Sequence, residues 1–433
     1  MLSRAERKEK IYAIIRVASG NFMEMYDFMV FGYYAIYIAK TFFPMQNEYA
    51  SLMLSLSTFG AGFLMRPLGA IVLGAYIDKH GRRAGLILTL TLMAVGILTI
   101  VCTPGYETLG LFAPAIVVVG RLLQGLSAGV ELGGVSVYLA EIAPPGRRGF
   151  YCCWQSASQQ MAVVFAAVLG VILSRMLPPE AMTLYGWRIP LIIGCLILPV
   201  IFILRRSLKE TDVFTARTHR PNARQILRMV LRNWQVVLCG AMMTTLTTTC
   251  FYLITAYTPT FGQKELHLST HDSLLVTLFV GASNFLWLPV GGLLSDRFGR
   301  RPVLLFYTIL VPLFSYPLMV WLTDAPSFSR LLLALLVFSH AFGTYNGAMV
   351  PYLTEVMPPE VRTSGFALAY SLATALFGGF TPAISTFLIH ETGNRAMPAA
   401  WLSLSALLAL TAVLILKRKE RTTPSADANA ALT

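Results

Sequence analysis

Five charged side chains stand inside stretches of sequence that are otherwise apolar, and both signs of charge are among them: Glu24, Asp27, Arg66, Arg121 and Glu131. A charge is costly inside a membrane, so charges within apolar stretches are candidate functional groups. The planar guanidinium group of arginine matches a carboxylate with two parallel hydrogen bonds. A carboxyl group that is withdrawn from water can exist in its protonated form near neutral pH. Together these residue types predict a site that binds an anionic carboxylate and takes up protons.

The depth of these charges follows from helix geometry, if each apolar stretch is a helix that crosses a membrane. With a rise of ~1.5 Å per residue, Glu24 and Asp27 lie ~18 and ~22 Å from the inner end of the first stretch. Arg66 lies ~18 Å above the end of the second, and Arg121 and Glu131 lie ~14–15 Å from the ends of the fourth. Because the hydrocarbon core is ~30 Å thick, most of them fall near its middle. They must therefore face one another or an aqueous cavity, where alternating-access carriers bind substrate.

Neutral polar residues share the faces of these charges. If the fourth stretch is one helix, Arg121, Gln124 and Glu131 form a single polar stripe. Asn21 lies one turn before Glu24 on the first stretch. The predicted substrate-binding residues are Arg121, Gln124, Asn21, Arg66, Gln155, Gln159, Tyr345 and Asn346, and the predicted proton-coupling residues are Glu24, Asp27 and Glu131.

Structural roles compete with functional ones at several of these positions. Arg121 can instead form a buried ion pair with Glu24 or Glu131. Arg66 precedes a proline, so its side chain can instead serve carbonyl groups that a kink sets free. The two glutamines of the fifth stretch can simply bond neighbouring helices.

The elements that must position these residues are membrane-spanning helices. Hydrophobic residues make up 56% of the chain and charged residues 13%, about half of the charged share of soluble domains. Twelve apolar runs are long enough to cross a bilayer as helices. They cover about 12–40, 51–77, 84–102, 112–140, 150–176, 187–206, 233–262, 272–296, 302–323, 329–356, 362–390 and 398–417. An all-α membrane protein with twelve transmembrane helices is therefore predicted.

An internal repeat divides these helices into two pseudo-symmetric halves of six. The run Gly74–Arg83 returns as Gly292–Arg301, and Glu141–Arg148 returns as Glu355–Arg362 at nearly the same offset. Duplication of this kind in an apolar chain is typical of secondary transporters. The predicted domains are an N-terminal half (1–206), a cytoplasmic linker (207–232), a C-terminal half (233–417) and a disordered cytoplasmic tail (418–433).

The charged residues of the repeated motifs lie at helix ends rather than at mid-depth. Salt bridges and helix-end contacts that hold the cytoplasmic side closed are the better interpretation, with no contact to substrate. The predicted gating residues are Asp78, Arg82, Arg83, Glu141, Arg148, Asp296, Arg300, Arg301, Glu355 and Arg362.

The basic residues are distributed unequally between the two sides of the membrane. Most of the 34 lysines and arginines lie in the termini and in every second loop, so these segments are predicted to be cytoplasmic. The net charge of +13 is thereby explained by topology and anionic lipid, and a nucleic-acid partner is not expected. The expected location is a bacterial inner membrane, with both termini in the cytoplasm.

Other classes of protein leave no signature. The six cysteines are scattered through apolar stretches without CxxC spacing, so neither a metal nor a disulfide is predicted. Walker-type phosphate loops, HExxH motifs and nucleophile elbows are missing, so neither an enzyme nor a cofactor is expected.

Several motifs resemble those of a known family. The repeated Gly-x-x-x-Asp-x-x-Gly-Arg-Arg motif resembles the signature of the major facilitator superfamily. The runs Ser19–Phe28, Arg66–Gly69 and Gly120–Gly125 resemble its metabolite–proton symporter branch. Within that branch, from about residue 11 to 416, the chain looks most like bacterial citrate and tricarballylate carriers. The stretches that suggest this are Ala39–Pro44, Val130–Tyr138, Trp154–Gln160, Tyr257–Thr260, Tyr345–Val350 and Gly379–Thr386.

This resemblance implies proton-coupled import of a tricarboxylate, citrate or tricarballylate, by alternating access, through what is expected to be a monomer. Sodium coupling through the same carboxylates stays open, as does a dicarboxylate such as 2-oxoglutarate. A zwitterion such as betaine would need an aromatic cage, for which Tyr26, Trp154, Tyr345 and Tyr352 are available. A transporter-like receptor that no longer transports is the rival from another class.

Overall fold

The computed structural model describes residues 4–80, 82–129, 131–206, 223–358 and 362–422. In the N-terminal half the elements are α1 (Arg4–Tyr33), α2 (Ala35–Phe42), α3 (Glu48–Leu64), α4 (Arg66–His80), α5 (Arg82–Cys102), α6 (Tyr106–Leu109), α7 (Phe112–Ala128), α8 (Glu131–Ile142), α9 (Arg148–Met176), α10 (Pro179–Ala181), the π-helical turn η1 (Met182–Gly186) and α11 (Arg188–Arg206). After them come α13 (Ala223–Arg232), α14 (Trp234–Ile254), α15 (Thr258–Lys264), α16 (Thr270–Phe298), α17 (Arg300–Asp324), α18 (Phe328–Val356), α19 (Arg362–Ala373), the π-helical turn η2 (Thr374–Gly378), α20 (Thr381–Thr392) and α21 (Pro398–Thr422).

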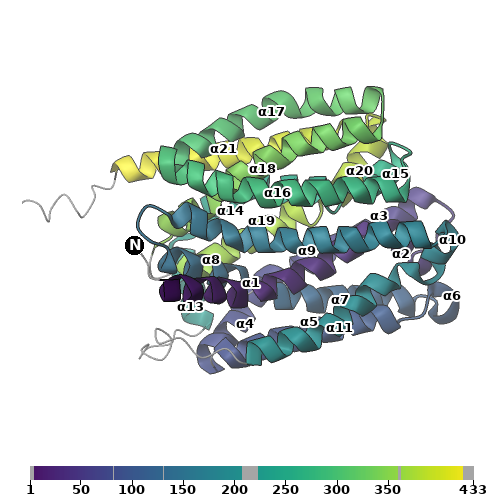
Figure 1. Ribbon diagram of the computed structural model, residues 1–433, viewed down its shortest axis with the longest axis horizontal. Coiled ribbons are helices and arrows are strands. Elements are labelled where there is room, and N and C mark those ends of the chain that lie inside the picture. Colours follow the sequence, from purple (N-terminus) through teal and green to yellow (C-terminus); the bar gives the residue numbers. More distant parts are fainter. Residues whose placement is uncertain (1–3, 81, 130, 207–222, 359–361, 423–433) are drawn as a thin grey trace, which may run out of the picture.

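The long helices run side by side in two groups that follow the order of the chain. Figure 1 shows the helices up to α11 below and those from α14 onward above, with α9 and α16 in contact between them. The first and last described helices begin and end at the same end of the bundle (Figure 1). A chain that crosses a membrane an even number of times begins and ends on the same side, so the arrangement agrees with the predicted twelve transmembrane helices.

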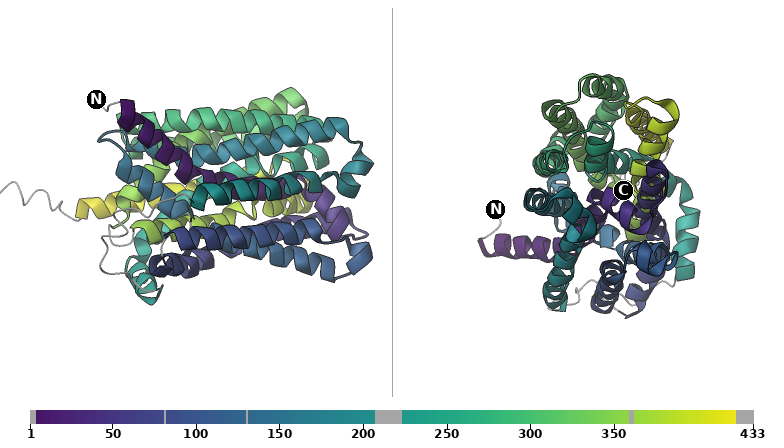
Figure 2. Two further views of the ribbon diagram at one scale, coloured as in Figure 1. Left: turned by 60° about the horizontal axis from the view of Figure 1, so that its bottom comes forward. Right: turned by 90° about the vertical axis from the view of Figure 1, so that its right-hand side faces the viewer.

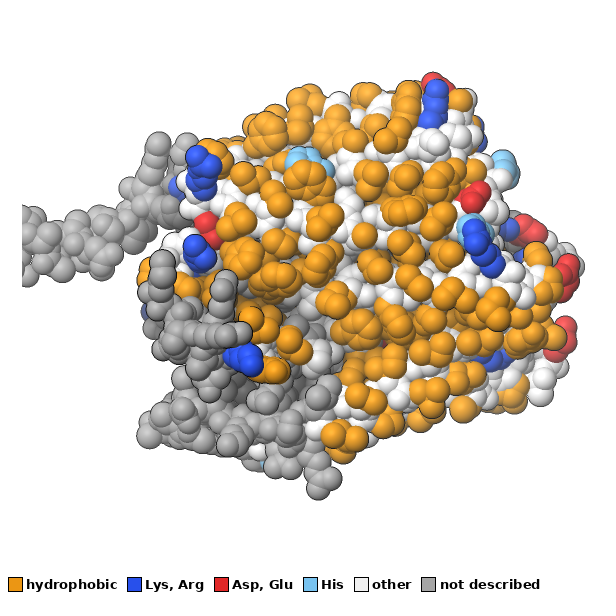
Figure 3. Space-filling view, in the orientation of Figure 1, with side chains coloured by type: hydrophobic (Ala, Val, Ile, Leu, Met, Phe, Trp, Pro, Cys, Tyr) orange, Lys and Arg blue, Asp and Glu red, His pale blue; other side chains and the backbone are white. Residues whose placement is uncertain are grey.

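The apolar character of the helices fits a membrane. Eight helices of the described chain are long and apolar enough to cross one, and a ninth joins them if the bent pair Pro179–Gly186 and Arg188–Ile203 is one span. The three other predicted spans are also helical, as α1 with its charges and as the shorter apolar helices Ile87–Cys102 and Phe112–Ala128. Figure 3 shows apolar side chains over the middle of the visible face, with most charged groups toward its two ends. The predicted all-α membrane fold is confirmed.

The second predicted span breaks where a proline stands. It divides at Met65, just before Arg66 and Pro67, because proline lacks the amide hydrogen that would continue the helix. The fourth span is described as α7, which ends at Ala128, and α8, which begins at Glu131, and Val130 between them lies outside the described residues. The break at Met65 lies directly before the buried Arg66.

Glycine residues allow the second and fourth spans to pack closely. A Cβ atom on Gly125 would lie 1.5 Å from the carbonyl oxygen of Gly62, and one on Gly129 would lie 2.1 Å from that of Arg66. Only glycine permits this approach of the α3–α4 and α7 backbones, which is usual where membrane helices pack closely. The result places Arg66 and Arg121 on neighbouring helices.

Two predicted boundaries change. The helix of the first span begins at Arg4, earlier than expected, and pauses at Tyr34. The tail predicted as disordered from 418 is helical to Thr422, and the rest of it lies outside the described residues. The linker is helical over 223–232, as expected for part of it, while 207–222 lie outside the described residues.

Candidate substrate and proton site

A buried ion pair lies at the centre of the N-terminal half. Arg66 donates from Nη2 to Glu24 Oε1 at 2.6 Å, and the two side chains are 1% and 0% exposed. The guanidinium group of Arg66 also lies over the rings of Phe28 and Phe63, at 5.0 and 4.8 Å from their centroids. Its side chain is therefore directed at a carboxylate and not at carbonyls freed by the break. Glu24, one of the two carboxylates considered as an ion-pair partner of Arg121, thus pairs with Arg66.

Arg121 lies on α7 in a setting that is almost wholly aromatic. It donates from Nη1 to Gln124 Oε1 at 2.8 Å and from Nη2 to the carbonyl oxygen of Phe59 at 3.4 Å. Its guanidinium carbon lies 4.3 and 4.6 Å from the ring centroids of Phe28 and Phe31. An arginine over aromatic rings can still donate hydrogen bonds, because its N–H groups lie in the plane of the guanidinium group. Arg121 thus has a charge that nearby hydrogen bonds satisfy only in part.

Asp27 is the second buried carboxylate of α1. Its side chain is 2% exposed, and its Oδ2 atom accepts no hydrogen bond from the described residues. Arg121 is the cation that acts on it electrostatically. Asn21 is also buried, and neither side-chain atom has a hydrogen-bond partner there. Polar atoms are rarely left in this condition, so they are candidates for contact with a ligand or with water.

Arg66 lines a small cavity between the two halves. Its volume of about 10 Å³ suits one water molecule at most, far less than the hundreds of Å³ of ordinary ligand pockets. The cavity is therefore closed around no more than a water-sized space, and side chains must move before a larger ligand enters. The lining residues are Met25, Arg66, Ser156, Gln159, Thr248, Phe251, Tyr252, Phe342 and Tyr370.

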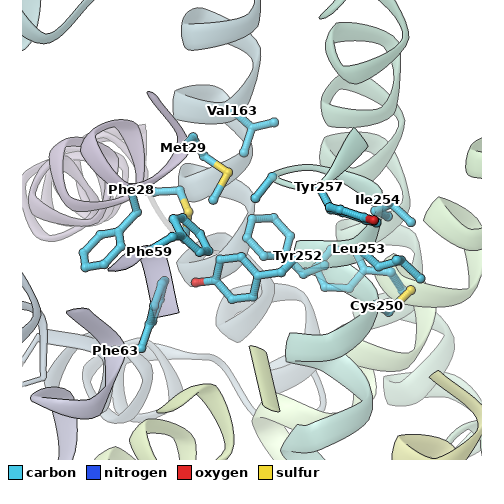
Figure 4. Close-up of a cluster of buried hydrophobic side chains, with 14 of the residues drawn as sticks. Phe28, Met29, Phe59, Phe63, Val163, Cys250, Tyr252, Leu253, Ile254 and Tyr257 are labelled. Atoms are coloured by element: carbon cyan, nitrogen blue, oxygen red, sulfur yellow. The ribbon is translucent and has the colours of Figure 1, made fainter. Parts of the chain in front are cut away.

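Aromatic side chains close the seam between the halves above this cavity. Tyr252 reaches from α14 toward Phe59 and Phe63 of α3, as Figure 4 shows, with ring centroids 6.0 and 5.1 Å apart. Four residues that line the cavity, Thr248, Phe251, Tyr252 and Tyr370, are not among the site residues predicted from the sequence. Whether these residues line the cavity depends on which helices pack against one another, and a local sequence pattern does not contain that information.

The predicted neutral residues divide into two groups. Gln159 lines the cavity, and Asn346 donates across the halves to Ser156 Oγ at 2.7 Å, which in turn donates to Gln155 Oε1. Gln124 holds Arg121. Tyr345 is elsewhere: its hydroxyl donates to the carbonyl oxygen of Met243 at 2.8 Å and fastens α18 to α14.

The aromatic cage considered for a zwitterion is not assembled. The Tyr26 hydroxyl donates to the carbonyl oxygen of Pro190, and Trp154 packs edge-on against Phe285. Tyr345 faces Met243 as above, and the Tyr352 hydroxyl accepts from Arg301 Nε. None of the four lines the cavity.

At the end of the bundle that holds both chain termini, one carboxylate joins the halves. Asp296, near the end of α16, accepts hydrogen bonds from the amides of Gly149 and Phe150 at 2.8 and 3.0 Å. Those amides belong to the first turn of α9, where a negative charge is favourable. Arg300 donates to the same carboxylate at 2.7 Å and to Glu355 at 3.2 Å. We call this group the Asp296 clamp.

The remaining gating predictions are only partly placed. Arg301 donates to the Tyr352 hydroxyl at 3.1 Å, and Arg362 begins α19. Glu141 and Arg148 are exposed, and Arg148 shares a surface hollow with Arg300 and Glu355. The side chains of Asp78, Arg82, Arg83 and Glu131 lie outside the described part of the chain.

At the opposite end, contacts that sequence patterns did not predict also join the halves. Lys264 Nζ lies 3.1 Å from Glu48 Oε2, and the rings of Tyr49 and His390 stack with centroids 3.7 Å apart. Arg175 Nε donates to His271 Nε2 at 2.9 Å. We call these the external contacts. Because both ends are bridged, the central cavity is closed to both sides.

This arrangement defines a class. Two bundles of apolar helices from one chain enclose buried arginines and carboxylates, and polar contacts close both ends, which is the design of a secondary transporter with alternating access. Comparison with known proteins then gives the family. Residues 13–237 match the family "Sugar (and other) transporter", and residues 272–432 match the "Major Facilitator Superfamily".

Similar proteins refine this result. The chain is 60% identical to a citrate-proton symporter of Klebsiella pneumoniae, over 95% of this chain and 92% of that one. It is 33% identical to an alpha-ketoglutarate permease of Escherichia coli, over 96% of each. The crystal structure of a D-xylose-proton symporter has the same fold, with a TM-score of 0.73 at 19% identity over 93% and 96% of the two chains. The chain belongs to the major facilitator superfamily of multi-pass membrane transporters, in the branch of the citrate-proton symporters.

Proposed function

We propose that this protein imports citrate together with protons by alternating access. The observation that carries the proposal is the 60% identity to a citrate-proton symporter along almost the whole of both chains. The buried chemistry supports it independently, because two fully buried arginines stand beside two buried carboxylates of α1. A tricarboxylate requires such charge-assisted donors.

Arg121 and Arg66 are the proposed carboxylate-binding groups. Among the described residues, Arg121 donates hydrogen bonds to a neutral amide and a carbonyl and forms no ion pair, so its charge is available to an incoming anion. Arg66 lines the cavity but is held by Glu24. Protonation of Glu24 would weaken that pair and release Arg66 for substrate, which links proton uptake to binding. Asp27 is the second proposed protonation site, since a carboxyl group withdrawn from water favours its neutral form.

Proton coupling also follows from the energetics of the substrate. Importing an anion into a negative cell opposes the membrane potential by about 2.3 kcal/mol per charge per 100 mV. Enough protons must accompany a polyanion to cancel its charge. Co-transported sodium ions would also cancel the charge of the substrate, so the uptake experiment must distinguish protons from sodium.

We further infer that the protein resides in a bacterial inner membrane with both termini in the cytoplasm. The distribution of basic residues and the common end of the first and last described helices support this topology. The segments 1–206 and 233–417 are the proposed moving halves. Both halves line the cavity, so one copy supplies a complete pathway and a monomer is the proposed unit.

Uptake of labelled citrate into vesicles containing the purified protein tests this function. An inward proton gradient should drive accumulation, an uncoupler should abolish it, and sodium removal should leave it unchanged. Competition with labelled citrate by unlabelled citrate, tricarballylate, 2-oxoglutarate and betaine then tests which class of substrate the protein prefers. If betaine competes best, or only sodium drives uptake, the corresponding part is wrong. If nothing accumulates in intact, correctly inserted protein, the receptor interpretation is favoured.

A further inference from the structure

Helix α13 has three distinct faces. Arg224, Arg228 and Arg232 recur every fourth residue, so they fall within a sector of ~80° on one side. Leu227 and Leu231 form the adjoining sector and are 41% and 61% exposed. The rest of the helix packs on the bundle, where Val230 is buried.

The position of α13 is that of a helix at a membrane surface. It contacts α4, α14 and α19 at the end that holds both chain termini. It lies at the edge of the molecule and runs across the direction of the long helices, as both views in Figure 2 show (teal). Such an orientation places a helix in the plane of a bilayer surface rather than through it.

Exposed apolar side chains also stand on two of the helices that α13 contacts. On α4, Leu68 and Val72 are exposed, and on α14 the same holds for Trp234 and Leu238. Trp234 is the first residue of α14, where tryptophan is favoured at the boundary between hydrocarbon and headgroups. The leucines and arginines of α13 are thus exposed on adjoining faces, next to helices that themselves expose apolar side chains.

The arginines of α13 have no ion-pair partner among the described residues, and all three are exposed. Three cations in this condition next to exposed leucines match the chemistry of an anionic phospholipid, which offers a phosphodiester above apolar chains.

We propose that α13 is a binding site for anionic phospholipid of the inner leaflet, with Arg224, Arg228 and Arg232 on the headgroups and Leu227 and Leu231 in the acyl region. The site is separate from the central cavity. It ties the linker between the halves to the membrane surface and does not depend on the identity of the transported substrate.

A spin label at position 227 tests the proposal in the full chain. The native cysteines are replaced, uptake is checked, and Leu227→Cys is labelled in vesicles of phosphatidylcholine with or without phosphatidylglycerol. Collision rates with oxygen, which concentrates in hydrocarbon, and with a water-soluble nickel complex report the depth of the label. With phosphatidylglycerol the label should read as membrane-embedded, and without it as more aqueous. A label at Leu238→Cys should read as embedded in both.

The charge requirement is tested by Arg224→Gln/Arg228→Gln. Each arginine near an anionic surface changes the binding equilibrium by about fivefold, so the pair should shift it toward water by about twenty-five-fold. Arg147→Gln/Arg297→Gln removes the same charge from exposed sites at the same end and should have no effect. High salt on the unaltered helix should mimic the first variant, which guards against misfolding. A label that stays aqueous in phosphatidylglycerol, or stays embedded regardless of lipid charge and arginines, overturns the proposal.

Discussion

The aromatic setting of Arg121 makes a specific demand on its side chain. The guanidinium carbon lies over the rings of Phe28 and Phe31, while the group donates to the amide oxygen of Gln124 and the carbonyl oxygen of Phe59. A lysine carries the charge but has no plane to stack and no fork to divide between two acceptors. Charge alone is therefore insufficient at this position.

Arg121→Lys should consequently lose most citrate uptake, and Arg121→Ala nearly all of it. Loss of one charge-assisted hydrogen bond to a carboxylate costs about 1.5–3 kcal/mol, or roughly ten- to a hundredfold in uptake rate at low citrate. Initial rates at equal membrane levels provide the measurement. Arg188→Lys is the matched control, because Arg188 also stacks on a ring, that of Trp187, but lies away from the cavity. Normal uptake by Arg121→Ala would remove Arg121 from the site.

The two carboxylates of α1 should behave differently when neutralised. Glu24→Gln leaves Arg66 buried without its ion-pair partner, which typically destabilises a protein by about 3–5 kcal/mol. Asp27→Asn removes no hydrogen bond from Oδ2 and should fold normally. If Asp27 carries the coupled proton, Asp27→Asn loses accumulation but keeps exchange of internal for external citrate, because exchange moves no net proton. Accumulation that survives in Asp27→Asn would assign coupling to another group.

Residue types and depth predicted which charges are buried, but not how they pair. The sequence left Glu24 and Glu131 as alternative partners of Arg121, whereas Glu24 pairs with Arg66, next to glycine contacts that bring the α3–α4 break against α7. A close approach of two backbones is a property of the packed pair of helices, and neither sequence segment contains it alone.

At the scale of elements, the Asp296 clamp uses the end of one helix to hold the start of another. The link between Asp296 and Arg300 spans four residues and could be expected from the motif itself. From the sequence, a helix N-terminus could be predicted as a partner of Asp296, but not that the helix would be α9. The polar stripe predicted from Gln124 to Glu131 assumes one continuous helix, and it stays a prediction because Val130 and the side chain of Glu131 lie outside the described residues.

Asp296→Asn should weaken the clamp without touching substrate. An amide side chain keeps one acceptor for the α9 amides but loses the charge that binds Arg300 and suits the helix terminus. We expect faster labelling from the cytoplasmic side of Val135→Cys on α8, slower transport, and citrate binding changed only by the population shift. Asp324→Asn, an exposed carboxylate on α17, should change neither. Lost citrate binding with unchanged labelling would move Asp296 into the substrate site.

At the scale of the whole molecule, both ends of the pathway are bridged while the cavity holds only a water-sized space. The Asp296 clamp and the external contacts act on one equilibrium from opposite ends. Breaking either set should shift populations only by the free energy which that set contributes. Pairs such as Tyr49 with His390 join distant segments, so no sequence pattern predicted them.

Glu48→Lys should therefore produce the opposite shift to Asp296→Asn. Two lysines would then face each other where Lys264 now meets Glu48, and repulsion should favour opening to the outside. Labelling of Ser55→Cys on α3 from the external side should rise, by about two- to fivefold for a pair so exposed. Glu48→Lys/Lys264→Glu restores opposite charges and should return labelling to the original rate.

Because the two ends share no partner among the described residues, the free-energy shifts of Glu48→Lys and Asp296→Asn should add when the two changes are combined. Both closed ends are then weakened, and each cysteine should label faster than in the unaltered protein, though more slowly than with the matching single change. If the two changes instead leave each other's labelling rates untouched, the ends open independently, and the halves do not move as two rigid bodies around a closed centre.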